Sequence, residues 1–452
     1  MEIERPALLM GALIASSVAL ASNTVDKTNP NILFILVDDL GLGDLSCQYA
    51  KDLSTPNIDR IFETGVRLDN FYANSSVSSP SRAALLTGRF PAMVGVPGVI
   101  RPSVDQNWGY FAPSAVTMPA LLKSGGYSTA LIGKWHLGWE SPNLPNERGF
   151  DHFHGFLADM MDDYYTHRRQ GGNYMFLNDK EIDPKGHATD LFTSWSVDYI
   201  KREAKAKNPF FLYLAYNAPH SPLQPPVEWV NKVQARDKSL PVKRARLIAL
   251  IEHLDYNIGK VMQALKESGQ LDNTLVIFAS DNGGDRGSMA NNGPIRGAKG
   301  DMFEGGIRVP CALNMPGVFE GGRRDNHFIV MMDLLPTICE LVNIPIKHEI
   351  DGISVLDAVK GKTQDTEGRF VYWLRNEGGA QFGGKSQSAV RYNEYKLLQN
   401  LPFEKAQMFN LKEDSLETAS LPLKGDMFRK LNSAMTRHYR AWGAIPCQAP
   451  SK

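Results

Sequence analysis

Four apolar, β-rich runs separated by helical patterns are the feature that most constrains the fold of this chain. They cover residues 31–37, 128–132, 209–216 and 274–280. Continuous apolar runs of this length are typical of parallel strands that are buried on both faces. The clearest helix is predicted over 244–268, where apolar residues recur at three- and four-residue spacing. The alternation predicts an α/β fold with a mostly parallel central sheet sandwiched by helices.

A different pattern begins near residue 361. Short alternating segments at 370–373, 388–391 and 395–398 precede a polar helical pattern near 424–440. This pattern predicts a small antiparallel sheet with one helix. We therefore predict a large α/β domain at residues 28–360 and a C-terminal subdomain at residues 361–452.

The N-terminal segment resembles an export signal. Arg5 and Pro6 precede an apolar run over 7–20, and Ala19, Leu20 and Ala21 include the small residues that a signal peptidase recognises. We predict a signal peptide at residues 1–22 and a periplasmic or secreted protein. The alternative is a short membrane anchor, although the run is shorter than the roughly 20 residues needed to span a bilayer. No later segment is long and apolar enough for stable membrane insertion.

Composition excludes some partners. Lys plus Arg equals Asp plus Glu, at 49 each, so no overall field attracts the chain to nucleic acid or to an anionic membrane. Any recognition of anions must be local. The four cysteines show no C-x-x-C spacing, which argues against a zinc site or a disulfide scaffold and favours packing roles.

Acidic pairs follow two of the predicted strands. Asp38 and Asp39 come directly after the first run, and Asp281 and Asn282 follow the fourth. Such a pair is often only a cap or a turn, but the carboxyl ends of parallel strands meet at one edge of the sheet. Adjacent carboxylates repel each other unless a cation compensates them. Oxygen ligands without His or Cys favour Ca²⁺ or Mg²⁺ over zinc.

The segment 78–89 reads Ser-Ser-Pro-Ser-Arg-Ala-Ala-Leu-Leu-Thr-Gly-Arg. Pro80 suits the first turn of a helix, so Ser78 is predicted just before a helix N-terminus. Unpaired N–H groups and the helix dipole favour negative charge at that place. Taken alone, the serine could be no more than a helix cap.

The whole segment resembles the signature of the type I sulfatases, which belong to the alkaline phosphatase superfamily. That signature is Cys or Ser followed by x-Pro-Ser-Arg-x-x-Leu-Leu-Thr-Gly-Arg, and every fixed position is met. Residues 126–136, Gly-Tyr-Ser-Thr-Ala-Leu-Ile-Gly-Lys-Trp-His, match the second signature of the family. The resemblance covers nearly the whole chain after residue 22. It implies an alkaline phosphatase-like fold and a sulfuric ester hydrolase.

The resemblance also implies that Ser78 is oxidised to formylglycine (3-oxoalanine). Serine at this position is similar to the bacterial type, which a radical-SAM enzyme matures. A plain serine would form a stable sulfate ester, whereas an aldehyde hydrate has a second hydroxyl whose deprotonation expels sulfate.

Further roles follow from the resemblance. Asp38, Asp39, Asp281 and Asn282 are expected to bind one calcium ion together with the hydroxyl at Ser78.

The remaining site residues are expected to act on sulfate and protons. His136 would accept the second proton of the diol, and Lys134 would bind sulfate and the diol; both would project to one side if the chain stays extended. Lys299 would bind sulfate, and either His220 or Lys299 would protonate the leaving alcohol. Arg82 would hold the diol.

The substrate is less defined by the sequence. Segments 162–167 and 222–226 are similar to segments of arylsulfatase B, which favours a glycan sulfate ester of galactose or N-acetylgalactosamine, such as a glycosaminoglycan. The alternative is that these loops are shared by many relatives. Two other functions stay open. One is a phosphoesterase of the same superfamily, although the sequence lacks the extra zinc ligands that such an enzyme needs. The other is a non-catalytic binder of sulfated glycans, if Ser78 is not oxidised.

Overall fold

The computed structural model describes residue 1 and residues 29–103, 106–206, 208–377 and 386–449. Apart from residue 1, the predicted signal peptide at residues 1–22 lies outside the described residues. None of the helices in the described part of the chain combines the length and the apolar character that crossing a bilayer requires.

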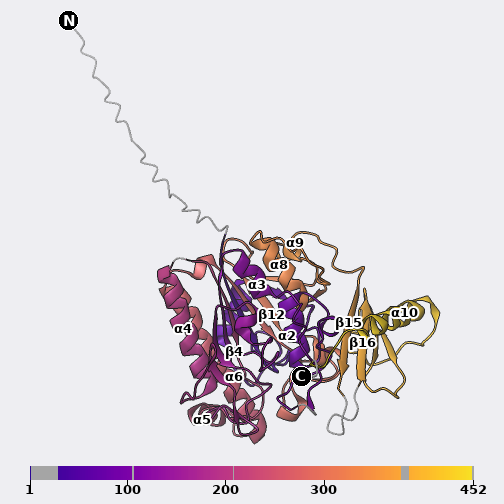
Figure 1. The fold of residues 1–452 in the computed structure, drawn as a ribbon, viewed down its shortest axis with the longest axis horizontal. Helices are drawn as coiled ribbons and strands as arrows, with labels where there is room; N and C mark the ends of the chain where they lie inside the picture. The colour runs from indigo at the N-terminus through magenta and orange to yellow at the C-terminus, as the bar shows by residue number, and fades with distance from the viewer. Residues whose placement is uncertain (2–28, 104–105, 207, 378–385, 450–452) are drawn as a thin grey trace.

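A ten-stranded sheet forms the centre of the larger part of the molecule (Figure 1). Its five central strands pair in parallel in the order β11 (Thr274–Ser280), β1 (Asn31–Val37), β10 (Phe210–Ala215), β4 (Ser128–Lys134) and β5 (His152–Phe156). Antiparallel pairing extends both sides of this centre, except that the outermost strand beyond β11 pairs in parallel with its neighbour. The outer strands are β12 (Cys311–Asn314), β2 (Val66–Leu68) and β13 (Arg323–Asp325) beside β11, and β8 (Met175–Leu177) and β9 (Lys180–Glu181) beside β5.

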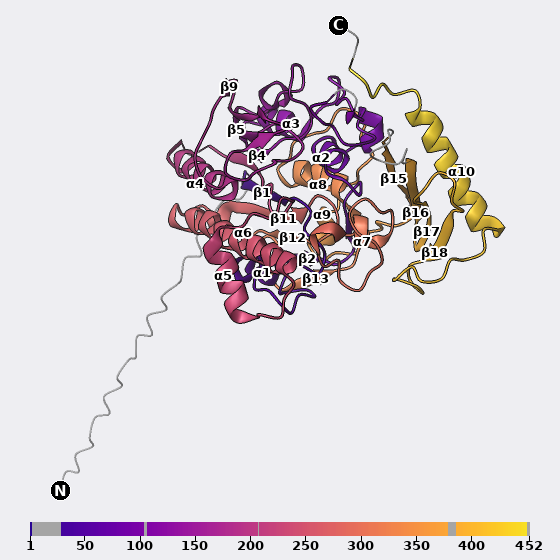
Figure 2. The ribbon, with the colours of Figure 1, turned by 90° about the horizontal axis from the view of Figure 1, so that it is seen from below.

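Strand β1 shows why its sequence is apolar at nearly every position. All seven of its residues are buried, and alternate side chains such as Phe34 and Ile35 belong to two different cores on the two faces of the sheet. Figure 2 shows α4, α5 and α6 along one face and α2 and α8 on the other. The α/β sandwich predicted from the sequence is therefore confirmed.

Helices from two parts of the chain cover each face. The core with Phe34 includes residues of α2 (Ser78–Thr87), α3 (Met118–Ser124), α8 (Leu334–Leu341) and α9 (Leu356–Val359). The core with Ile35 includes residues of α1 (Pro56–Thr64), α4 (Ala188–Ala206), α5 (Val227–Arg236) and α6 (Val242–Glu267), which is the helix predicted near 244–268.

A separate antiparallel sheet follows near the C-terminus, as predicted. It consists of β15 (Phe370–Asn376), β16 (Ser386–Tyr392), β17 (Tyr395–Gln399) and β18 (Gln407–Asn410), with α10 (Gly425–Trp442) packed on its outer face. Its inner face packs against the larger part through Trp373, whose Nε1 donates to the Ala73 carbonyl at 2.7 Å. The division of the chain after residue 360 stays a prediction.

Short elements complete the described structure. They are β3 (Phe71–Tyr72) paired with β14 (Ile329–Val330), β6 (Arg168–Arg169) paired with β7 (Gly172–Asn173), and α7 (Glu304–Ile307). All four cysteines lie within the described residues and none forms a disulfide; Cys311 and Cys339 are buried, whereas Cys47 and Cys447 are partly exposed.

Candidate functional site

The carboxyl ends of the parallel strands bring the two predicted acidic pairs together. Val37 pairs with Ser280 at the ends of β1 and β11, so Asp38 and Asp281 leave the sheet at the same level. The Asp281 N–H donates to the Val37 carbonyl at 3.1 Å, and the Asp39 N–H donates to Asp281 Oδ1 at 3.2 Å. Asn282 Nδ2 donates to Asp39 Oδ1 at 2.8 Å. Side chains more than 240 residues apart in sequence therefore form one buried group.

Ser78 lies against this acidic group. It is the first residue of α2, not the residue before the helix as predicted, because Val77 is the last residue with an extended backbone. Pro80 still falls in the first turn, where its missing N–H costs no intrahelical hydrogen bond. Ser78 Oγ donates to Asp38 Oδ1 at 3.0 Å and lies 3.3 Å from Asn282 Oδ1.

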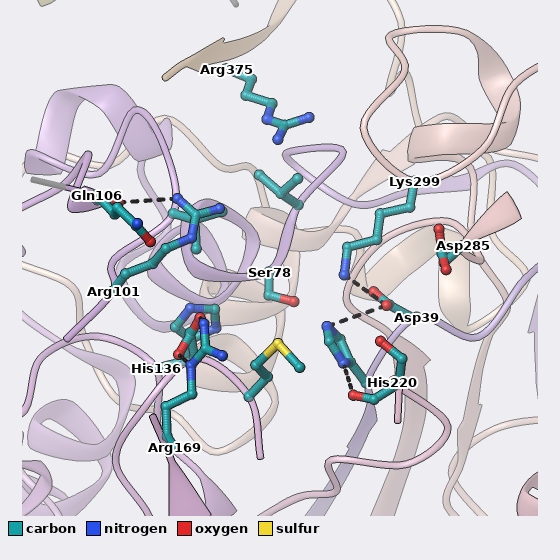
Figure 3. Close-up of a pocket in the computed structure, with 15 residues that line it drawn as sticks. Asp39, Ser78, Arg101, Gln106, His136, Arg169, His220, Asp285, Lys299 and Arg375 are labelled. Carbon is teal, nitrogen blue, oxygen red and sulfur yellow. Dashed lines mark hydrogen bonds and ion pairs between the residues drawn. The ribbon is translucent and has the colours of Figure 1, made fainter. Parts of the chain in front are cut away.

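A cavity of about 400 Å³ opens over Ser78 (Figure 3). This volume lies within the range of about 300–1,000 Å³ that is typical of small-molecule sites. Asp39, His136, His220 and Lys299 also line it, so the structure brings these predicted residues together around Ser78.

Each acidic side chain has a cationic partner. Lys134 Nζ donates to Asp38 Oδ2 at 2.6 Å, and Lys299 Nζ donates to Asp39 Oδ2 at 2.7 Å. Arg82, fully buried in α2, donates to Asp281 through Nη2 at 2.7 Å and through Nε at 3.2 Å.

The crowding of charges shifts several pKa values. Burial alone would raise the pKa of Asp38, but the charges of Lys134, His220 and Arg82 outweigh it and hold that pKa well below its usual value. Burial and the neighbouring charge of Asp38 raise the pKa of Asp281 in spite of Arg82. Burial also lowers the pKa of Lys134, which favours the neutral amine against the pull of Asp38. Charge on Asp281 is therefore disfavoured in this group, a cost that a further cation would reduce.

His136 reaches the cavity by a turn of the backbone. The chain is not extended between Lys134 and His136, because His136 has a left-handed φ of 60°. Its Nε2 lies 3.0 Å from the Ile100 carbonyl, which can only accept, so Nε2 carries the proton and Nδ1 keeps a lone pair. Nδ1 has no hydrogen-bond partner among the described residues. Burial and the charge of Lys134 lower the pKa of His136 well below its usual value, so the ring is neutral at neutral pH.

His220 differs from His136 in which ring nitrogen contacts a backbone carbonyl. Its Nδ1 donates to the Ser221 carbonyl at 2.6 Å, and its Nε2 lies 3.5 Å from Asp39 Oδ2. Tyr164 Oη donates to the His220 carbonyl at 2.8 Å, and Gln224 Oε1 accepts from the Tyr164 N–H at 2.8 Å. The two loops that were singled out for the substrate, 162–167 and 222–226, therefore contact each other beside His220.

The cavity also contains residues that the sequence analysis did not identify. Figure 3 shows Arg101, Gln106, Arg169, Asp285 and Arg375 around Ser78, and Asp159 also lines the cavity. Arg375 has a recognisable signal, since it is a charged residue that directly follows the apolar run of β15. Arg169 lies in the short strand β6 and the others come from loops, where sequence alone gives no sign of which side chains face the cavity.

Two groups of side chains in the described part of the chain are close enough to be considered as metal sites. One contains Asp38 and Asp39 with His220. The other, His187, Asp190 and His253, lies apart from the cavity. Both ring nitrogens of His187 are already used, Nε2 by the Gln224 carbonyl at 3.1 Å and Nδ1 by the Thr189 N–H at 3.3 Å, so we do not interpret this second group as a metal site.

Comparison with known families gives two matches. The family described as Sulfatase matches residues 30–344, and the family described as N-sulphoglucosamine sulphohydrolase, C-terminal, matches residues 298–440.

Individual relatives agree with the family matches. Mouse arylsulfatase J is 30% identical over 84% of this chain, and dog N-acetylgalactosamine-6-sulfatase is 32% identical over 81%. The matched regions cover 66% and 71% of those two proteins. The crystal structure of Ps i-CgsB in complex with k-i-k-neocarrahexaose is 30% identical, covers 93% of this chain and 95% of that one, and superposes with a TM-score of 0.84.

Proposed function

Because the chain belongs to the sulfatase family of sulfuric ester hydrolases, we propose that it removes sulfate from a sulfated carbohydrate at Ser78. The observation that carries this proposal is the place of Ser78, whose Oγ contacts Asp38 at 3.0 Å beneath a cavity that Lys299 also lines. This arrangement supports a nucleophile at Ser78, with oxygen ligands for a metal ion and a cation for the sulfate beside it. The relatives with carbohydrate names favour a glycan sulfate, and the 162–167 and 222–226 loops favour galactose or N-acetylgalactosamine.

We propose that Ser78 acts as formylglycine, formed by a radical-SAM maturase. Its hydrate supplies one hydroxyl as the nucleophile and a second whose loss of a proton releases sulfate. His136 Nδ1, with its free lone pair and neutral ring, is suited to accept that proton. Arg82 donates to Asp281, so its assignment to the diol stays a prediction.

The oxygen atoms around Ser78 fit a calcium ion. Asp38, Asp39, Asp281 and Asn282 would hold the ion together with the group at Ser78, and their carboxylate and amide oxygens are ligands that Ca²⁺ prefers. When bound, calcium would increase the acidity of the attacking hydroxyl and offset charge on the sulfuryl oxygens.

The chain's own cations and His220 would complete the reaction. Lys134 and Lys299 would bind sulfate oxygens once the ion takes over their present partners, Asp38 and Asp39. His220 would protonate the leaving alcohol from Nε2 when both ring nitrogens carry a proton, since its Nδ1–H is held by the Ser221 carbonyl. We also propose that the apolar segment 7–20 exports the protein to the periplasm or the medium.

The mass of the peptide that contains Ser78 tests the proposal. The active protein should carry formylglycine there, which has two hydrogen atoms fewer than serine. Ser78→Ala should abolish sulfate release without lowering the thermal midpoint, whereas the nearby Ser76→Ala should keep activity because Ser76 Oγ has no hydrogen-bond partner among the described residues.

Two outcomes would contradict this assignment. Sulfate release by protein with an unmodified Ser78 would exclude the formylglycine mechanism. Metal analysis that finds zinc instead of calcium, together with phosphate ester hydrolysis, would favour the phosphoesterase alternative.

A further inference from the structure

A second cationic region lies in the cavity, apart from the residues assigned to the scissile sulfate. In Figure 3, Arg375 and Arg101 lie on the side of Ser78 away from His220. Arg375 comes from β15 of the C-terminal sheet, and Arg101 comes from the loop after α2. Two parts of the chain that are far apart in sequence therefore place guanidinium groups at one wall of the cavity.

Both arginines are anchored on one carboxylate. Arg375 Nε donates to Glu377 Oε1 at 2.9 Å, while Arg101 Nη2 donates to Glu377 Oε2 at 3.2 Å. The Glu377 side chain is fully buried, and it also accepts from the Val99 N–H at 3.3 Å. Burial raises the pKa of Glu377, but Arg375 and Arg101 lower it by more, so the carboxylate is charged and holds both arginines in place.

Arg375 keeps donors for a ligand. Glu377 is shared with Arg101, so it compensates the charge of Arg375 only in part. Arg375 Nη1 has long contacts of 3.5 Å to the Gly300 carbonyl and to Gln387 Oε1, and within the described residues Nη2 makes no hydrogen bond. Only 10% of the Arg375 side chain is exposed, so its charge is poorly solvated and an anion beside it would be stabilised.

The other acidic groups near this wall are already engaged. Asp159 accepts two hydrogen bonds from Arg169, both at 2.8 Å, and Arg169 also donates to Asp162 at 2.8 Å. Asp285, on the Lys299 side of the cavity in Figure 3, accepts from Ser288 Oγ at 2.7 Å.

We propose that Arg375 and Arg101 form a second anion-binding subsite, which takes a second sulfate or a carboxylate of the same substrate molecule. A planar guanidinium offers paired N–H donors that match the oxygens of either group. The inference rests on the proposed function, since it places the scissile sulfate at Ser78 and names substrates with two anionic groups. The preferred substrate is therefore a carbohydrate that is sulfated twice, or sulfated next to a uronic acid.

Binding of defined sugars to full-length protein with Ser78→Ala, in the presence of calcium, tests the subsite without turnover. The ligands are galactose and N-acetylgalactosamine monosulfates, the corresponding disulfates, and a monosulfated disaccharide with a uronic acid. Calorimetry should show that a ligand with two anionic groups binds more tightly than each monosulfate. Comparing the disulfates with the uronic acid disaccharide identifies whether the subsite binds a second sulfate or a carboxylate.

Arg375→Gln should then remove the preference. It should weaken binding of the two-anion ligand by about tenfold or more, as expected for loss of a charge-assisted hydrogen bond, and should weaken monosulfate binding much less. Arg324→Gln is the matched control, because Arg324 is 67% exposed and pairs with Asp69 outside the cavity. Arg101→Gln gives a second measurement if Arg375→Gln lowers the thermal midpoint.

The outcomes separate this inference from the proposed function. Equal losses for both ligand classes, or no preference before the substitution, would overturn the subsite. If the preference and its loss are seen but unsubstituted protein releases no sulfate from any of these sugars, the proposed function fails and the subsite stands.

Discussion

His136 and His220 each hold a proton on a different ring nitrogen, so each has a different nitrogen left for the reaction. The Ile100 carbonyl keeps the proton of His136 on Nε2, and the Ser221 carbonyl keeps that of His220 on Nδ1. His136 is buried beside Lys134, which disfavours a second proton, whereas His220 Nε2 faces the carboxylate of Asp39 at 3.5 Å. A second proton on His136 is therefore disfavoured, which leaves its Nδ1 as a proton acceptor.

Removing the imidazole at position 220 should affect poor leaving groups most. We expect His220→Ala to lower kcat/KM by about 10²–10⁴-fold for sugar sulfates, the usual contribution of a general acid, and far less for 4-nitrophenyl sulfate. A series of aryl sulfates with increasing leaving-group pKa should show a steeper decline for the variant. His348→Ala, outside the cavity, serves as control. Equal losses across the series would show that His220 does not protonate the leaving group.

At the scale of elements, the positions of the strands in the sequence were more predictable than the packing of one element against another. The apolar run at 31–37 coincides with β1, because a strand buried on both faces needs apolar residues throughout. The acidic pairs after β1 and β11 could be placed together because the carboxyl ends of parallel strands meet at one edge of the sheet. Arg375 could not be placed, because its position depends on how β15 packs against the larger part, and local sequence does not encode that packing.

The cap of α1 also depends on a distant element. Asp255 in α6 accepts from the N–H groups of Asn57 and Ile58 at 3.0 and 2.8 Å, although the N-cap residue Thr55 makes no capping hydrogen bond. Burial raises the pKa of Asp255 to about 6 in spite of these bonds.

This raised pKa predicts a pH dependence of stability. Between about pH 4 and pH 6 the folded state holds a proton on Asp255 that the unfolded state has lost, so stability falls as pH rises through this window. Asp255→Asn keeps an acceptor oxygen and does not titrate. Denaturant unfolding from pH 4 to 7 should therefore show the wild type losing up to about 3 kcal/mol relative to this variant. A difference that stays constant over this range would refute the assigned shift.

At the scale of the whole molecule, a buried ionic contact joins the C-terminal sheet to the larger part of the chain. Lys396 in β17 lies 2.9 Å from Glu304 of α7 and 2.9 Å from Glu417, which follows β18. All three side chains are at most 1% exposed. The contact matters for the cavity, because the C-terminal sheet supplies Arg375.

Lys396→Met should therefore weaken both the packing of the C-terminal sheet against the larger part and ligand binding in the cavity. It leaves Glu417 without its cationic partner and leaves Glu304 only the 3.9 Å pair with Arg308. Removing one partner of a buried pair costs about 3–5 kcal/mol. We expect a lower thermal midpoint, faster proteolysis between the two parts, and weaker binding of two-anion sugars. Lys362→Met, which breaks an exposed pair with Asp357, should leave the thermal midpoint almost unchanged, because water and salt screen exposed ion pairs. Adding Glu417→Gln to Lys396→Met should restore part of the lost thermal midpoint, since it removes one unpaired charge. Equal midpoints for the two lysine variants would show that the contact does not hold the C-terminal sheet to the larger part.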